Sequence, residues 1–334
     1  MQTVNLCRHF IGSTSWTTPA ELLFLLRGVG DEIRAVYTED PAVVNMVRRI
    51  LAAVREETAR QHDNDASRPK DEVSSLLLWT LPQNVSSRHH PVAQSSSERH
   101  ESVGGENELV TSDTLSYPES YYARHPQLKE IILEAVHEIY NELVDMRDAV
   151  AEQVPQQIHS GDVILVCGRG LTLARFLAAT APSTTLLVCG SPSLANHLQH
   201  KDINCPATVI PIALAQAVAV ASRVHTTVIS AHAVLANGGV VSTAGSALVV
   251  AATPTPTLCV TGMDALCPQY PHEGQDTLQE WMAPTMGKDV QPMYDYIPPE
   301  QINLFVTNAG SFPPSFIYRL LAENYHSDDW KLFR

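Results

Sequence analysis

The stretch Val163–Phe176, VILVCGRGLTLARF, decides the fold class of this chain. Its five apolar residues predict a strand buried on both faces, its glycines predict a tight turn, and LTLARF begins a helix. Further strands of the same kind follow: TTLLVC (184–189), ATVIP (207–211), TTVIS (226–230), TLCVT (257–261) and NLFVT (303–307). Uniformly apolar strands alternating with helices predict a doubly wound α/β domain, with a parallel sheet covered on both faces.

The residues before this sheet predict helices. The segment TTPAELLFLLR offers a threonine N-cap (17 or 18) followed by Pro19, and a second helix begins at the Asp-Pro pair 40–41. A long amphipathic helix with a continuous apolar stripe covers residues 126–154. We therefore expect an N-terminal helical region (1–63), a long helix that completes it and leads into the sheet (123–160), and the α/β domain (161–334).

Residues 64–122 separate the two helical parts. Apart from the apolar patch SLLLWTL (75–81), this segment is rich in Ser, His, Glu and Gly and has almost no apolar periodicity. Such a composition buries too little apolar surface to offset the entropy of ordering the chain. We therefore predict a largely disordered insertion.

Composition restricts the classes of protein to which the chain belongs. The 334 residues carry a formal net charge of −14, which argues against nucleic-acid binding because no overall excess of Lys and Arg replaces phosphate counterions. No apolar run reaches the roughly 18 residues that span a bilayer, and no signal peptide is evident. The six cysteines include no CxxC pair, which predicts reduced thiols. We expect a soluble cytosolic protein without cofactor, metal, membrane or nucleic-acid partner.

Functional and structural interpretations of the opening stretch compete. As a dinucleotide fingerprint GRGLTL fails at its sixth position, Leu173, so the glycines either contact a phosphate or only form a tight turn. Cys167 is either a nucleophile activated by Arg169 and the helix N-terminus or a small core residue. His232 follows a strand, where it is either catalytic or simply hydrogen-bonded or solvated. The residues alone leave these alternatives open.

Four segments resemble a known family: VVNMVRRILAAVREE (43–57), HAVLANGG (232–239), YDYIPPEQINLFVTNAG (294–310) and PPSFIYRLLAENYHSDDW (313–330). They are similar to the family that contains the alpha, beta and delta subunits of translation initiation factor 2B and the methylthioribose-1-phosphate and ribose-1,5-bisphosphate isomerases. The resemblance covers roughly residues 20–62 and 125–330 and leaves the insertion unmatched. It implies a helical N-terminal domain and a Rossmann-like C-terminal domain.

The resemblance also implies where the isomerase chemistry would lie. The catalytic cysteine of the enzymes falls at Gly168, one position after Cys167, and their catalytic aspartate falls at His232. The arginine that holds the substrate phosphate has no counterpart in the loop GSP (190–192). A sugar-phosphate isomerase needs both acid/base groups and an anion clamp. Gly168 and His232 are therefore degenerate positions, and we predict no catalytic residues.

Two hypotheses from different classes follow. The preferred one is a non-catalytic regulatory subunit of the initiation factor 2B complex, which the resemblance implies is a guanine nucleotide exchange factor. By the same resemblance, the chain would pair with a delta-like subunit and join alpha-, gamma- and epsilon-like subunits. It would also bind the alpha subunit of initiation factor 2 and sense its phosphorylation. The alternative is a phosphosugar isomerase with a rearranged site that uses Cys167 and His232. The candidate interaction residues are Asn45, Arg48, Arg49, Asn237, Gly238, Tyr294, Asp295, Tyr296, Pro298, Pro299, Tyr318 and Arg319.

Overall fold

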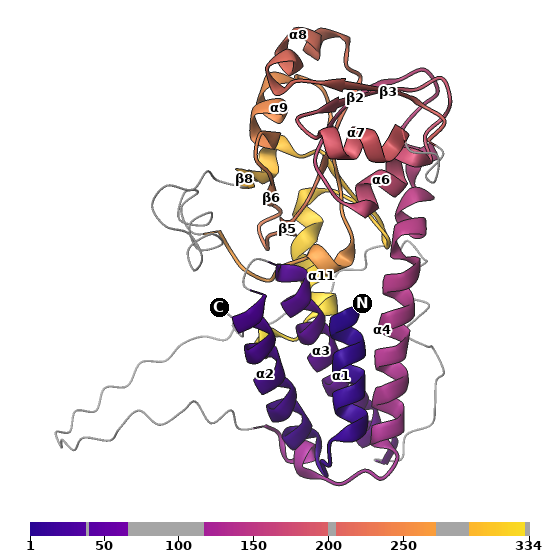
Figure 1. Ribbon diagram of the computed structural model, residues 1–334. Coiled ribbons are helices and arrows are strands. Elements are labelled where there is room, and N and C mark those ends of the chain that lie inside the picture. Colours follow the sequence, from indigo (N-terminus) through magenta and orange to yellow (C-terminus); the bar gives the residue numbers. More distant parts are fainter. Residues whose placement is uncertain (38–39, 66–116, 200–204, 272–293, 331–334) are drawn as a thin grey trace, which may run out of the picture.

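The computed structural model describes residues 1–37, 40–65, 117–199, 205–271 and 294–330, and these form a helical layer and an α/β layer (Figure 1). The elements of the helical layer are α1 (Gln2–Ser13), α2 (Pro19–Val36), α3 (Pro41–Asp65), the short 3-10 helix η2 (Glu119–Tyr122) and α4 (Leu128–Ala151). In Figure 1, α4 runs from the far end of the helices up to the sheet. It is therefore a structural member of both layers. The greater part of the predicted insertion lies outside the described residues.

Local sequence sets where the helices begin. The Thr18 hydroxyl accepts a hydrogen bond from the Glu21 N–H (3.3 Å), and the Glu21 carboxylate accepts one from the Thr17 N–H (2.9 Å). This reciprocal pair satisfies two donors at the start of α2 and confirms the predicted N-cap. The Asp40 carboxylate accepts from the Ala42 N–H (3.1 Å) in the same way at the start of α3.

The α/β layer is built on a seven-stranded sheet with the strand order β10-β9-β7-β4-β1-β2-β3. Its strands are β1 (Val163–Cys167), β2 (Thr185–Cys189), β3 (Thr208–Ile212), β4 (Thr226–Ser230), β7 (Thr257–Val260), β9 (Leu304–Thr307) and β10 (Gly310–Phe312). All neighbours pair in parallel except β9 and β10, which are antiparallel. The predicted fold class is confirmed, and every predicted strand is present.

Short helices connect these strands. They are α5 (Val154–Gln157), α6 (Leu171–Ala178), α7 (Pro192–Gln199), α8 (Ala217–Val220), α9 (Ser246–Ala252) and α11 (Ile317–Asn324), with the 3-10 helices η3 (Leu214–Gln216), η4 (Ala221–Arg223), η5 (Met263–Ala265), η6 (Pro299–Gln301), η7 (Pro314–Phe316) and η8 (Ser327–Asp329). The segment 213–224, whose apolar residues and alanines favour a helix, is broken into η3, α8 and η4. Among the described helices, none combines the length and apolar character needed to cross a membrane.

A second, three-stranded antiparallel sheet contains β5 (Ala233–Val234), β6 (Val240–Thr243) and β8 (Tyr294–Ile297). The segments 294–300 and 308–315 are rich in Pro and aromatic residues, which is typical of constrained turns, yet both contain strands. The start of the first segment is β8, whose alternating YDYI pattern suits a half-buried pleated strand. Within the second, residues 310–312 form β10, which pairs with β9. The prolines that suggested turns lie after these short strands.

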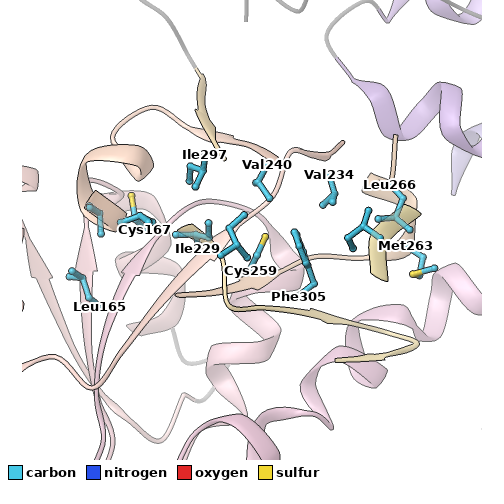
Figure 2. Close-up of a cluster of buried hydrophobic side chains, with 14 of the residues drawn as sticks. Leu165, Cys167, Ile229, Val234, Val240, Cys259, Met263, Leu266, Ile297 and Phe305 are labelled. Atoms are coloured by element: carbon cyan, nitrogen blue, oxygen red, sulfur yellow. The ribbon is translucent and has the colours of Figure 1, made fainter. Parts of the chain in front are cut away.

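The two layers have separate apolar cores. The core of the helical layer takes its α4 side chains from Leu128 to Met146, whereas Val150, one turn further, belongs to the core on one face of the main sheet. Figure 2 shows the core of the other face, which extends from Leu165 on β1 past Cys259 to Leu266. Because no apolar core is common to both layers, polar contacts contribute much of the interface between them.

Two phenylalanine variants test this assignment of the cores. Phe305 is fully buried at the centre of the core in Figure 2, whereas Phe24 on α2 is 74% exposed. We expect Phe305→Ala to lower the free energy of unfolding by about 3–5 kcal/mol, through lost burial and a cavity. Phe24→Ala is the matched control and should change it by less than about 0.5 kcal/mol. Denaturant titration of both variants measures the difference, and equal effects would contradict the model of the core.

Candidate functional site

The carboxyl ends of β1 and β4 meet at the GRG turn. The Arg169 N–H donates to the Ser230 hydroxyl at the end of β4 (3.0 Å). Gly168 and Gly170 have φ values of +155° and +109°, which L side chains rarely adopt. A Cβ atom on Gly168 would overlap the Ser230 hydroxyl and lie 2.9 Å from the Ser230 nitrogen. The neighbouring strand therefore closes position 168 to any side chain.

Cys167 is packed as a core residue. Its side chain is 3% exposed, and Figure 2 shows it in the same cluster as Ile229 and Ile297. Burial raises the pKa of the Cys167 thiol, and the Ser246 hydroxyl, 3.4 Å from the sulfur, offsets this only in part. Within the described ranges its hydrogen-bond partner is thus a neutral hydroxyl. Burial outweighs this hydrogen bond, so the net effect disfavours the thiolate that a nucleophile requires.

His232 lies against the small sheet. Its backbone N–H donates to the Val241 carbonyl (2.8 Å), and its ring stacks on the Tyr294 ring with the centroids 4.4 Å apart. Stacking orients the imidazole plane along that of the tyrosine. The described part of the chain contains no group of three or more His, Cys, Asp or Glu side chains that could hold a metal ion.

The loop Asn237-Gly238-Gly239 is fixed by contacts within the chain. The Asn237 amide donates to the Tyr296 hydroxyl (2.9 Å), and its oxygen accepts from the Gly239 N–H (2.9 Å). Gly238 has a φ of +82°, and a Cβ there would lie 2.7 Å from the Pro314 carbonyl oxygen. These contacts join the loop to β8 and η7, and they give Asn237, Gly238 and Tyr296 a structural role.

Asp295 belongs to β8 and contacts the start of α9. Its carboxylate accepts hydrogen bonds from the backbone N–H groups of Gly245 (2.7 Å) and Ala247 (3.1 Å). These donors lie at the start of α9, so Asp295 acts as the N-terminal cap of that helix. Pro298 and Pro299, which follow, are half-buried at the start of η6.

Asn45 and Arg48 are buried, with 0% and 2% of their surface exposed. The Asn45 amide donates to the Asp264 carbonyl (3.0 Å) and to the Cys267 sulfur (3.3 Å), and Arg48 donates to the Asn45 oxygen (2.8 Å). Both side chains are therefore inaccessible to a partner of the folded chain. They join α3 to the α/β layer instead. The polar character that made them candidates in the sequence serves this internal interface.

Arg49 on α3 also takes part in contacts within the chain that lead to the α/β layer. It forms an ion pair with Glu142 on α4, whose second oxygen accepts from the Asn308 amide (3.1 Å). The Asn308 oxygen in turn accepts from the Met263 N–H (3.0 Å). This chain of contacts links two helices of the helical layer to the turn between β9 and β10 and to η5.

Tyr318 and Arg319 on α11 are the most exposed of the candidate interaction residues. Tyr318 is 51% exposed and meets the Trp330 ring edge-on, with centroids 5.5 Å apart. Arg319 lies over the Phe316 ring at 5.2 Å and donates to Glu323 (2.8 Å). Exposed tyrosine and arginine side chains on a rigid helix are typical of protein interfaces. Their role as contacts stays a prediction.

Sequence reasoning does not identify three other residues that join the layers: Arg27, Arg55 and Asp329. Arg27 on α2 and Arg55 on α3 both donate to the Asp329 carboxylate, which is fully buried. In the sequence Asp329 is one of two adjacent acidic residues near a chain end. That pattern is typical of a solvated turn, so only the fold reveals the contact.

The described chain joins a helical layer to a parallel-sheet layer, with Cys167 buried and position 168 closely packed at the strand ends. The family model described as the Initiation factor 2 subunit family matches residues 1–314, and the chain belongs to this family. One relative is the translation initiation factor eIF2B subunit beta of Schizosaccharomyces pombe, 27% identical over 362 residues, which cover 98% of this chain and 91% of the relative. The protein of the same name from Dictyostelium discoideum is 28% identical over 347 residues, covering 97% of this chain and 89% of the relative.

Solved structures share the fold. The crystal structure of eIF2B beta from Chaetomium thermophilum matches with a TM-score of 0.67 and 21% identity, over 98% of this chain and 86% of that one. A chain of the tetrameric eIF2B-beta2-delta2 complex from the same organism matches with a TM-score of 0.65 and 19% identity, over 97% and 87% of the two chains.

A pair of glycine variants tests the closure of the strand end. Gly168→Ala should lower the free energy of unfolding by about 2–4 kcal/mol, because backbone strain adds to the clash with Ser230. Gly170→Ala is the matched control, since Gly170 also has positive φ but no atom within 4 Å of its added Cβ. Gly170→Ala should lower the free energy of unfolding by about 1–2 kcal/mol, because backbone strain is its only cost. Adding Ser230→Gly should recover part of the Gly168→Ala loss, and no recovery would refute the clash.

Thiol labelling tests the environment of Cys167. In the folded chain we expect Cys167 to react with a maleimide roughly a hundredfold more slowly than in the denatured chain, because labelling requires opening of the core. Cys205, which is partly exposed, is the internal control and should react first. Peptide mass spectrometry over time distinguishes the two sites. Rapid labelling of Cys167 would point to an activated cysteine.

Proposed function

We propose that this chain is a non-catalytic regulatory subunit of an eIF2B-type guanine nucleotide exchange complex, acting in the cytosol. The observation that carries the proposal is the extent of the similarity. The two beta-subunit relatives are 27% and 28% identical over 98% and 97% of this chain, and the chain covers 91% and 89% of them. Similarity that spans both layers favours a common role for the whole protein rather than one shared module.

The strand ends support a role without catalysis. Position 168, where the resemblance to the isomerases would put a catalytic cysteine, is closed by Ser230. Position 232, where it would put an aspartate, holds a histidine stacked on Tyr294. The nearby Cys167 is buried, and burial raises the pKa of its thiol. These residues are closely packed at the positions where the isomerases would have their catalytic residues.

A delta-like subunit is the first partner that we propose. A chain with the same fold belongs to a beta2-delta2 tetramer in C. thermophilum, so an equivalent pairing suits this chain. We propose that the α/β layer supplies the contact and that Tyr318 and Arg319 lie in or beside it. Alpha-, gamma- and epsilon-like subunits would complete the exchange complex.

The helical layer is proposed to help bind the alpha subunit of initiation factor 2 and to sense its phosphorylation. Because Asn45 and Arg48 are buried, this contact would use the exposed end of α3. There Glu56 is 58% exposed and pairs with Arg60, which is 45% exposed. Mixed exposed charge of this kind suits a partner surface whose own charge changes on phosphorylation.

Affinity purification of the tagged full chain from its own cells tests the proposal. We expect stoichiometric delta-, alpha-, gamma- and epsilon-like subunits, and nucleotide exchange activity on initiation factor 2 that falls when its alpha subunit is phosphorylated. The double variant Tyr318→Ala/Arg319→Ala should lower recovery of the delta-like subunit about tenfold, as loss of interface hot spots does. The control is Arg175→Ala, another exposed arginine of the α/β layer, which pairs only with Asp148 in the described chain. Recovery of the chain alone would contradict the proposal.

The isomerase alternative has its own discriminating assay. The purified chain is incubated with methylthioribose-1-phosphate and ribose-1,5-bisphosphate, and the ketose products are measured. We expect no turnover. Turnover that Cys167→Ala abolishes would replace the scaffold proposal with an enzymatic one.

A further inference from the structure

Polar contacts join the helical layer to the α/β layer. The Asn45 amide reaches the Asp264 carbonyl, and Glu142 on α4 reaches Asn308. Each layer has an apolar core of its own, and α4 is the element that contributes to both. The angle between the layers therefore depends on a few hydrogen bonds and ion pairs, which can break without opening either core.

Another of these contacts is made by the last turn of the described chain, Tyr325–Trp330, which we call the C-terminal strap. Its base is fixed to the α/β layer. Tyr325 belongs to the core shown in Figure 2, and its hydroxyl donates to the Leu266 carbonyl (2.9 Å). The Trp330 indole donates back to the Tyr325 carbonyl (3.2 Å), which closes the turn.

The tip of the strap is fixed to the helical layer. The Asp329 side chain is fully buried and accepts from Arg27 at 2.7 Å and from Arg55 at 2.9 and 3.2 Å. Arg55 binds both carboxylate oxygens, the two-point geometry that makes such pairs strong and directional. The guanidinium carbons of Arg27 and Arg55 each lie 5.5 Å from the centre of the Tyr117 ring, which adds a cation–π contact from each.

The charges in this cluster depend on one another for their balance. Arg27 is 11% and Arg55 5% exposed, so two cations are largely removed from water beside one buried carboxylate. Asp328 supplies a second, weaker anion, 3.5 Å from Arg55 and 48% exposed. If Asp329 leaves, the two guanidinium groups remain close together without their main counterion. They then regain stable solvation only if water enters between the layers.

We propose that the C-terminal strap is a releasable clasp that sets the orientation of the helical layer on the α/β layer. In the clasped state Asp329 is buried between Arg27 and Arg55. In the released state the three groups are hydrated, both cores persist, and the helical layer moves relative to the sheet about α4. A partner that binds the helical layer changes the orientation of the layers only by breaking this cluster. The proposal rests on these contacts alone and does not depend on the proposed function.

Spin-label distances in the full chain test the clasp. Labels are placed at two exposed sites, through Phe24→Cys on α2 and Leu171→Cys on α6, in a Cys205→Ser background. The parent should give one narrow distance distribution. Asp329→Asn should broaden or split it, because the amide replaces an acceptor with a donor that faces the guanidinium groups. Asp328→Asn is the matched control and should leave the distribution narrow. An unchanged distribution in Asp329→Asn overturns the proposal.

Hydrogen exchange on the same variants distinguishes release from unfolding. In Asp329→Asn, strap amides that are hydrogen-bonded in the parent, such as those of Asp329 and Trp330, should exchange at least tenfold faster. Those of β1 and β4 should keep their protection. Loss of protection in these strands as well would mean that the cluster is part of one global fold, which contradicts a clasp. Arg27→Met, which leaves the pairing of Asp329 with Arg55, should give an intermediate change in both measurements.

Discussion

The buried carboxylate of Asp329 joins parts of the chain that are far apart in sequence, since Arg27 and Arg55 lie 302 and 274 residues away. The core of the helical layer and the two cores of the main sheet are separate, and α4 is the element that contributes side chains to both layers. Their relative position depends on this ion cluster, on the contacts of Asn45 and on the pairing of Glu142 with Asn308. Polar groups restrict the orientation of the two layers, because a hydrogen bond has a preferred geometry whereas apolar packing is much less directional.

The carboxyl ends of β1 and β4 in the main sheet are closely packed. The strands, the tight turn and the following helix are all present, yet Gly168 approaches Ser230 so closely that no side chain fits. The neighbouring small sheet uses Asn237, Asp295 and Tyr296 to hold its own loops. Function in such folds depends on the residues at the site rather than on the topology. In this chain, Ser230, Asn237 and Asp295 form hydrogen bonds with other groups of the same chain.

Sequence patterns were sufficient to predict the main sheet and α2, α3 and α4. Buried strands are continuous apolar runs, and amphipathic helices repeat apolar residues every three or four positions. They failed for β8 and β10, which are short, contain few apolar residues and lie next to prolines. They also could not separate Asn45 and Arg48, which are buried, from Tyr318, which is exposed. A polar residue on a helix has the same local pattern whether it faces water or another layer. Only the tertiary contact decides this, and the ion cluster of Asp329 escaped prediction for the same reason.

The separation of Asp329 from Arg27 and Arg55, by 302 and 274 residues, also bears on how the protein is made. During synthesis α2 and α3 leave the ribosome long before residue 329 is translated, and domains that emerge first generally fold first. Arg27 and Arg55 then have no buried carboxylate between them until residue 329 has been translated. The helical layer would assemble early around its own core, and the two layers would dock last. A nascent chain would therefore expose these two arginines to other proteins until residue 329 is translated.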